Sequence, residues 1–243
     1  MLAALEEVTR SAARLTAALD TLTDEGTRAP SALAGWTRGH VISHVAQSVG
    51  AYRRLLAMAR TGIEPAPRTD AETFARAVRE GADRPAAELA TDLRGRLARL
   101  AEDAASMPPE RWGSLVTALA GWQHPAWYTL HRCWRELETH HVDLNVGYRT
   151  TDWPITYVTW ALDDTLTALA ARDFPVARVD ALDIGRSWNL SPKGPSIAGT
   201  GHALLGWLSG RAPASPLTSD RPLPPPPDWP LPPAPCPSPR HRS

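Results

Sequence analysis

The sequence has few cysteines, no long apolar run and no excess of charge of either sign. Its 243 residues include only two cysteines, Cys133 and Cys236, in a predicted helix and a proline-rich segment. We therefore expect no structural disulfide, and two cysteines are too few for a cysteine-based zinc finger. No stretch approaches the roughly 20 apolar residues of a membrane-spanning helix.

Charge and the absence of a targeting signal limit the expected partners and cellular location of the protein. The 26 Lys and Arg residues balance the 26 Asp and Glu residues, so charge gives no reason to expect a nucleic-acid or membrane partner. Residues Met1–Arg10 carry acids where a secretory signal would carry bases. We expect a cytoplasmic protein that is a monomer or a homodimer.

The first half of the chain shows the apolar spacing of helices. Apolar side chains from Leu2 to Leu22 recur every three or four residues, as they do on the buried face of a helix. Thr37 can cap a second helix, which would run to about Arg60 and stop at Gly62. The same spacing predicts further helices over residues 69–80, 85–105 and 125–144, the last with Pro125 in its first turn.

The pattern changes at Asp152-Trp-Pro154, and a small α+β unit is predicted beyond it. A helix over 154–171, a hairpin of strands 176–184 and 186–190 around Gly185, and a helix over 199–210 are expected. Proline is too frequent after residue 213 for a packed core, so 222–235 should be extended and exposed.

These segments give an α+β protein that is mainly α. Residues 1–150 are predicted to form a helical bundle, and 151–230 a small α/β domain. Residues 231–243 are predicted to be a disordered, proline-rich tail.

The segment Arg132–Leu144 carries the most informative chemistry. On a helix, Glu136 and His140 are four residues apart and lie on one face. A carboxylate and an imidazole at that spacing can bind one metal ion, and a catalytic zinc site needs three protein ligands and an open position. His44, on the inner face of the second predicted helix, is the candidate third ligand.

Alternative interpretations remain open for these residues. A Glu–His pair at this spacing is common on solvated helix faces, and a histidine among valines is often a hydrogen-bonded core residue. His40, one turn before His44, could exchange roles with it. Asp143 could orient a ligating imidazole or make local hydrogen bonds at the helix end. Glu138 and His141, on another face, are interpreted as a surface pair or as support for the ligands.

Two longer motifs resemble a known family. The segments Gly35–His44 (GWTRGHVISH) and Arg135–Leu144 (RELETHHVDL), followed by Asp152-Trp-Pro154, are similar to the signature segments of mycothiol-dependent maleylpyruvate isomerases. That family belongs to the DinB-like helical-bundle superfamily. Gly206–Arg211 (GWLSGR) and the proline-rich stretch after it resemble the family's second domain, so the resemblance extends to about residue 230.

The resemblance implies a fold, a metal site and a thiol cosubstrate. The fold would be an N-terminal DinB-like four-helix bundle followed by a small α/β domain. Zinc or another divalent metal would be held by His44, Glu136 and His140, the residues already identified above as candidate ligands. The thiol would be mycothiol. Arg211 would be a catalytic residue that meets substrate carboxylates; alternatively, it is only a charge at a helix C-terminus.

The chain also departs from the family pattern. Cys133 stands where a basic residue is expected and shares the face of Glu136 and His140, as a buried inert thiol or as part of the site. The segment Trp122–Trp127 is atypical, and its aromatic side chains with His124 could line a more apolar pocket. These departures affect the expected substrate more than the expected metal.

Three functions are compatible with these features. The first is cis–trans isomerisation of a maleylpyruvate-like compound, in which a metal-favoured thiolate adds to the double bond and is later expelled. The second is a mycothiol S-transferase or thiol-exchange enzyme of specialised metabolism. The third is a non-catalytic metal-binding protein that docks a partner.

Overall fold

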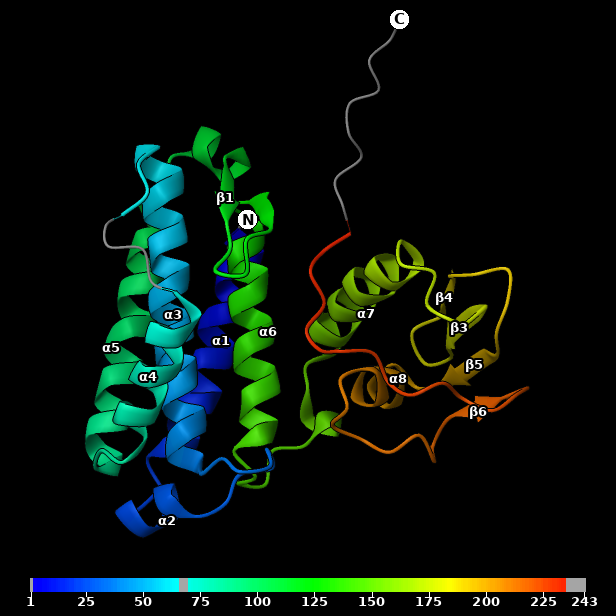
Figure 1. Cartoon of the computed structure of the whole chain (residues 1–243), viewed down its shortest axis with the longest axis horizontal. Coiled ribbons are helices and arrows are strands. Elements are labelled where there is room, and N and C mark those ends of the chain that lie inside the picture. Colours follow the sequence, from blue (N-terminus) through cyan, green and yellow to red (C-terminus); the bar gives the residue numbers. More distant parts are fainter. Residues whose placement is uncertain (1, 66–69, 235–243) are drawn as a thin grey trace, which may run out of the picture. The chain divides into compact units, whose positions relative to one another are not determined.

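The computed structural model describes residues 2–65 and 70–234, and the chain divides into two compact units, Met1–Tyr148 and Arg149–Ser243 (Figure 1). The first unit is helical, apart from one short hairpin, and the second combines helices with a sheet. The predicted α+β, mainly α class is therefore confirmed. None of the described helices is long and apolar enough to cross a bilayer.

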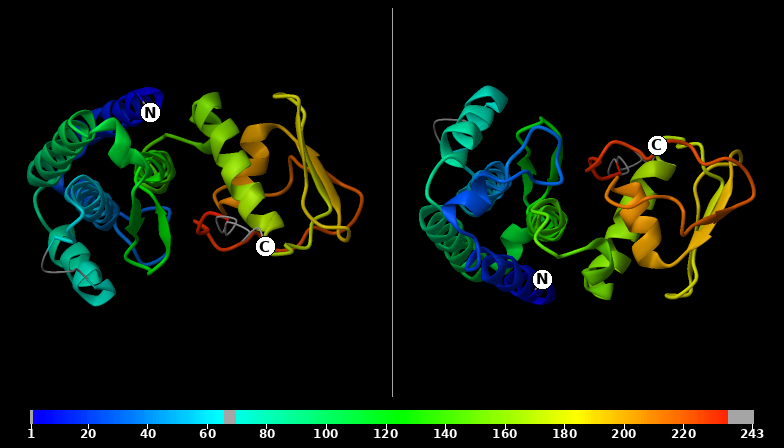
Figure 2. Two further views of the ribbon diagram at one scale, coloured as in Figure 1. Left: turned by 90° about the horizontal axis from the view of Figure 1, so that it is seen from above. Right: turned by 90° about the horizontal axis from the view of Figure 1, so that it is seen from below.

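Four long helices form the bundle of the first unit. They are α1 (Leu2–Leu19), α3 (Arg38–Thr61), α5 (Ala86–Ala105) and α6 (Tyr128–Asp143). Helix α3 packs against α5 and α6, and α1 packs against the same two helices from the other side. The short helix α2 (Asp24–Arg28) precedes α3, and α4 (Ala71–Ala82) lies outside the bundle beside α3 (Figure 2).

The predicted apolar faces of α3 and α5 point into the bundle core. Their side chains are all at most 6% exposed, namely Val41, Val45, Val49, Leu56, Leu89, Leu93, Leu97 and Leu100. Burial of each leucine or valine stabilises the fold by about 1.5–3 kcal/mol. The core therefore fixes the rotation of α3, the helix that carries His44.

Helix α3 begins and ends at the signals seen in the sequence. The Thr37 hydroxyl accepts a hydrogen bond from the His40 backbone N–H, and His40 Nδ1 accepts one in return from the Thr37 N–H, both at 3.3 Å. This is a capping box with histidine in the third position. At the other end Gly62 has a φ of 74°, the left-handed conformation that glycine adopts most easily.

The predicted start of the last bundle helix at Pro125 is wrong. Pro125 instead ends the strand β2 (Gln123–Pro125), which pairs antiparallel with β1 (Leu115–Thr117) across a turn at Gly121. The strand pairing of His124 with Val116 and of Pro125 with Leu115 keeps both residues extended, so α6 begins only at Tyr128. A 3₁₀ turn, η1 (Pro109–Gly113), leads into this hairpin.

The second unit is a four-stranded sheet with two helices on one side (Figures 1 and 2). The strand order is β4-β3-β5-β6, from β3 (Arg178–Ala181), β4 (Arg186–Asn189), β5 (Ser196–Gly199) and β6 (Thr218–Ser219). A short turn, η2 (Thr150–Asp152), precedes α7 (Ile155–Ala170), which packs against α8 (Gly201–Leu208).

The predicted hairpin around Gly185 is confirmed, because β3 and β4 pair antiparallel and Gly185 has a φ of 63°. Strands β5 and β6 were not predicted. Residues 222–234 form no helix or strand, as expected for the proline-rich segment. The predicted disordered tail, residues 231–243, lies outside the described residues from position 235 onward.

Candidate metal centre

Three side chains from two neighbouring helices converge in the first unit. Glu136 and His140 project from one face of α6, one turn apart, and His44 projects toward them from α3. His44 Nε2 lies 2.9 Å from Glu136 Oε1, and His140 Nε2 lies 3.5 Å from the same oxygen. The ligating atoms of all three lie within 4.8 Å of one another. The structure therefore brings together the three residues singled out in the sequence, which we term the ligand cluster.

The carboxylate of Glu136 has one satisfied and one unsatisfied oxygen. Its Oε2 accepts a hydrogen bond from the Tyr52 hydroxyl at 3.1 Å. Its Oε1 is buried and makes no hydrogen bond of acceptable geometry, although both imidazoles are close to it. A cation between the three groups would be bound by this oxygen and by both imidazoles, whose Nε2 atoms lie 2.9 and 3.5 Å from that oxygen. Two imidazoles and one carboxylate are a ligand set that zinc accepts.

The charges in the ligand cluster are strongly coupled. Burial alone would raise the pKa of Glu136, but the two imidazoles, His140 foremost, outweigh burial and hold that pKa well below its usual value. Burial opposes the charged form of His140, yet Glu136 and Asp143 raise the pKa of His140 to about 9. In the absence of a metal, His140 therefore carries a proton at neutral pH, which a metal ion would replace.

Asp143 orients the imidazole ring of His140. Its Oδ2 accepts a hydrogen bond from His140 Nδ1 at 2.9 Å, and its side chain is buried. This bond keeps a proton on Nδ1, so Nε2, the atom nearest Glu136, is the nitrogen that would lose its proton and bind a metal. Of the two interpretations of Asp143 in the sequence, the structure supports the orienting one.

Aromatic side chains surround His44. The rings of Trp36 and Phe74 lie edge-on to its imidazole, with centroids 5.4 and 5.5 Å away. The sequence interpretation missed both rings and also Tyr52. Tyr52 could have been found, because it lies two turns after His44 on the same face of the helix. His40, the alternative ligand, is instead part of the helix cap.

The pair Glu138 and His141 does not lie on the surface. Glu138 is 1% exposed and accepts hydrogen bonds from Ser11, from Arg14 at 2.5 Å and from Tyr148 at 2.6 Å. The His141 ring stacks on Tyr148 with centroids 3.9 Å apart. The surface interpretation is therefore wrong, because α1 covers this face of α6.

Cys133 is buried among the side chains around α6. Burial, and next Glu136, raise the pKa of its thiol well above the ordinary value. The group of ligating atoms found among the described residues does not include it. These observations agree with the interpretation of Cys133 as an inert core thiol.

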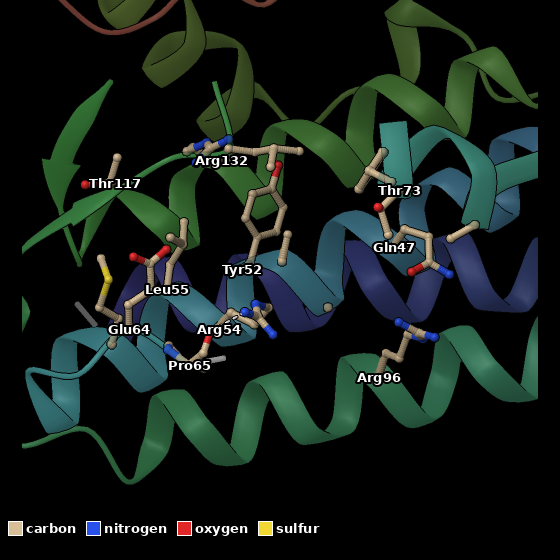
Figure 3. A pocket seen from close by; sticks show the side chains of 16 residues that line it. Gln47, Tyr52, Arg54, Leu55, Glu64, Pro65, Thr73, Arg96, Thr117 and Arg132 are labelled. Atoms are coloured by element: carbon tan, nitrogen blue, oxygen red, sulfur yellow. Dashed lines mark hydrogen bonds between the residues drawn. The ribbon is translucent and has the colours of Figure 1, made fainter. Parts of the chain in front are cut away.

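A pocket of about 360 Å³ lies in the first unit, and Figure 3 shows the side chains that line it. It shares Tyr52 and Phe74 with the surroundings of His44 and Glu136. His124 was expected to line a pocket, but its side chain is buried behind the wall, where its Nε2 contacts Arg132 at 3.2 Å. Burial lowers the pKa of His124 to about 4, so this imidazole is neutral.

Arg211 belongs to the second unit, three residues after the end of α8. Its backbone N–H donates to the Gly206 carbonyl at 2.9 Å, and its Nη1 donates to the Ser209 carbonyl at 2.5 Å. These contacts are typical of a cation at a helix C-terminus. Its role in binding substrate carboxylates stays a prediction.

Comparisons with known proteins identify a family from the sequence and a shared fold from the structure. Residues 8–145 match the family model of the mycothiol maleylpyruvate isomerase N-terminal domain. Two crystal structures of the mycothiol-dependent maleylpyruvate isomerase, one of them of a histidine-to-alanine mutant, share the fold with a TM-score of 0.84. They are 22% and 21% identical in sequence, and each alignment covers 93% of this chain and 95% of the other. No curated protein sequence gives a significant match.

Proposed function

Because this chain belongs to the mycothiol maleylpyruvate isomerase family, we propose that it is a zinc-dependent, or other divalent-metal-dependent, enzyme that uses mycothiol. It would activate the thiol for addition to an electrophilic small molecule and catalyse a maleylpyruvate isomerase-like cis–trans isomerisation. His44, Glu136 and His140 would hold the metal.

One observation carries this proposal. The buried oxygen Oε1 of Glu136 lies between two imidazole nitrogens and makes no acceptable hydrogen bond. Three protein ligands are the number used by catalytic zinc sites, which keep a further position for water or substrate. A structural zinc site would instead have four protein ligands, and the described residues contribute no fourth one to the group.

The residues around the ligand cluster have separate roles in this proposal. A bound zinc ion supplies positive charge that favours a thiolate over a thiol. Asp143 fixes the tautomer of His140, and the Tyr52 hydroxyl fixes the carboxylate of Glu136. Trp36 and Phe74 limit the access of water to His44.

The chemistry requires no nucleophile from the protein. The thiolate sulfur adds to one carbon of the activated double bond, which becomes a single bond and can rotate. Expulsion of the thiolate restores the double bond in the trans arrangement, so no atom is gained or lost. Negative charge develops on the conjugated carbonyl during addition, and a nearby cation stabilises it; Arg211 is the proposed cation.

The test is a combined measurement of metal content and thiol dependence on purified protein. We expect about one zinc per chain and mycothiol-dependent loss of the maleylpyruvate absorbance. Glu136→Ala should lose both, because it removes the central ligand. Glu80→Ala removes an exposed glutamate on α4 that pairs with Arg76 at 4.0 Å, and it should lose neither. Unchanged zinc content in Glu136→Ala would disprove the ligand assignment.

A mycothiol S-transferase or thiol-exchange enzyme is the second candidate. The pocket beside the ligand cluster has apolar side chains, among them Leu55, Met58 and Leu119, in its wall, and such a wall suits an apolar electrophile. A stable thioether formed from mycothiol and monobromobimane would support this activity. A protein that binds zinc but is inactive in both assays would favour the third candidate, a non-catalytic metal-binding protein.

A further inference from the structure

Arg132 is a pocket cation without a carboxylate partner. It lies on α6, one turn before Glu136, and lines the pocket shown in Figure 3. No Asp or Glu among the described residues lies within ion-pairing distance of its guanidinium. Arg96, in the same wall, differs because its Nε donates to Asp92 at 2.8 Å.

Aromatic rings and a neutral imidazole hold the Arg132 guanidinium in place. Its central carbon lies 4.6 Å from the ring centroid of Trp122 and 5.0 Å from that of Tyr52. Nη1 donates to His124 Nε2 at 3.2 Å, an atom that can accept because this imidazole is neutral. A guanidinium has five N–H groups, and the others have no acceptor among the described residues. The cation is thus fixed but not neutralised.

Apolar side chains make up much of the rest of the pocket wall, and the other charged residues in it are Arg54, Glu64 and Arg96. Leu55, Met58, Phe74 and Leu119 contribute side chains to it. A volume of about 360 Å³ falls in the range of small-molecule sites. A fixed cation beside these apolar side chains is complementary to a molecule with one anionic end and an apolar body.

We propose that Arg132 binds the carboxylate of a substrate whose remaining body is apolar and unsaturated or aromatic. Arginine forms paired, charge-assisted hydrogen bonds with carboxylates, and the position of Arg132 over two rings holds its guanidinium in the pocket wall. This inference rests on the proposed function, since it names the class of electrophile that the site would take.

The position of Tyr52 connects the carboxylate site to the ligand cluster. Its ring contacts Arg132, and its hydroxyl donates to Glu136 Oε2 at 3.1 Å. Figure 3 shows Tyr52 extending from α3 toward Arg132 on α6. A carboxylate on Arg132 therefore places the adjacent atoms of an unsaturated acid close to the ligand cluster.

Calorimetric titration of the zinc-supplemented protein with cinnamate, cinnamamide and acetate at pH 7.5 tests this inference. We expect cinnamate to bind at least tenfold more tightly than its neutral amide and than acetate, which lacks the apolar body. Arg132→Gln should weaken cinnamate binding by about 10–100-fold, the usual contribution of a hydrogen-bonded charge. Arg132→Lys, which keeps the charge but not the planar fork, should recover part of this loss.

Two matched variants separate the alternatives. Arg96→Gln removes a pocket arginine that already has a partner, and it should change cinnamate affinity less than threefold. Equal losses of cinnamate affinity in Arg96→Gln and Arg132→Gln would show that the total positive charge of the pocket, and not Arg132 itself, attracts the carboxylate. That result would overturn the assignment. Absence of cinnamate binding to the wild type would also overturn it.

The Glu136→Ala variant distinguishes this inference from the proposed function. If Glu136→Ala loses cinnamate and Arg132→Gln keeps it, the metal binds the carboxylate and the inference is wrong. If the wild type retains no zinc but shows Arg132-dependent cinnamate binding, the proposed function is wrong, and what stands is only that Arg132 binds a carboxylate with an apolar body. Circular dichroism spectra of all variants exclude unfolding as the cause.

Discussion

Helix α6 carries two carboxylate–imidazole pairs on different faces, and their surroundings differ. Glu138 accepts hydrogen bonds from three donors, one of them the cation Arg14. Glu136 has one hydroxyl donor, and its second oxygen faces two imidazoles without an acceptable hydrogen bond. Both carboxylates are embedded in the first unit, but only that of Glu136 is left incomplete by the protein.

The comparison shows that residue types alone do not identify a metal site. The two pairs have the same composition and nearly the same spacing, four residues in one pair and three in the other. What distinguishes them is whether protein donors already satisfy the carboxylate. We therefore expect substitutions on the Glu138 face to change stability and those on the Glu136 face to change metal binding.

The largest expected effect on stability is at Glu138. Glu138→Gln should lower the free energy of unfolding by about 2–4 kcal/mol, because it leaves Arg14 without its charge partner. The value is below that of a fully buried pair because 36% of the Arg14 side chain is exposed. Urea unfolding measures this loss, and zinc content should stay near that of the wild type. If Glu138→Gln kept the stability of the wild type but lost zinc, the roles assigned to the two faces of α6 would be wrong.

Asp143→Asn should weaken zinc binding by about 10–100-fold, which is the usual effect of removing a carboxylate behind a ligating histidine. The reason is that the bond to His140 Nδ1 fixes the tautomer with Nε2 free. Competition titration with a zinc-binding dye measures the affinity. His141→Gln, on the Glu138 face, is the matched control and should change zinc affinity less than threefold.

The smallest expected effect, when it is counted per pH unit, is a pH dependence of zinc affinity. His140 must lose a proton to bind zinc, and its pKa in the metal-free protein is raised to about 9. Affinity should therefore rise by up to tenfold per pH unit from pH 7 to 9 and then level off. Isothermal titration in buffers of different ionisation enthalpy should detect about one proton released per zinc. Absence of proton release at pH 7.5 would contradict the protonated state of His140.

Much of the bundle could be predicted from the sequence, because local signals and tertiary packing agree there. Thr37 and Gly62 fix the ends of α3 by backbone hydrogen bonding that involves only neighbouring residues. The spacing of Glu136 and His140 is likewise a local property of one helix. His44 could be predicted as the third ligand because it lies on the inner face of α3, next to valines that had to be buried.

The features that were missed depend on contacts distant in sequence. The hairpin β1–β2 has strands of three residues, too short to show an alternating pattern, and Pro125 suggested a helix start instead. The burial of Glu138 depends on Ser11 and Arg14 of α1, more than 120 residues earlier in the chain. Strand β6 has two residues and is defined only by its pairing with β5.

The separation of the three ligands along the chain has a consequence for the folding of this protein. His44 and Glu136 are about 90 residues apart, and Glu136 and His140 share a face only when α6 is formed, so an unfolded chain offers a metal no preformed three-ligand site. A metal that binds the native chain selectively raises its unfolding free energy with the logarithm of metal concentration. It would also act as a reversible cross-link across a long loop, tying the middle of α3 to α6. Metal supply would then set how long the bundle survives against local opening and proteolysis.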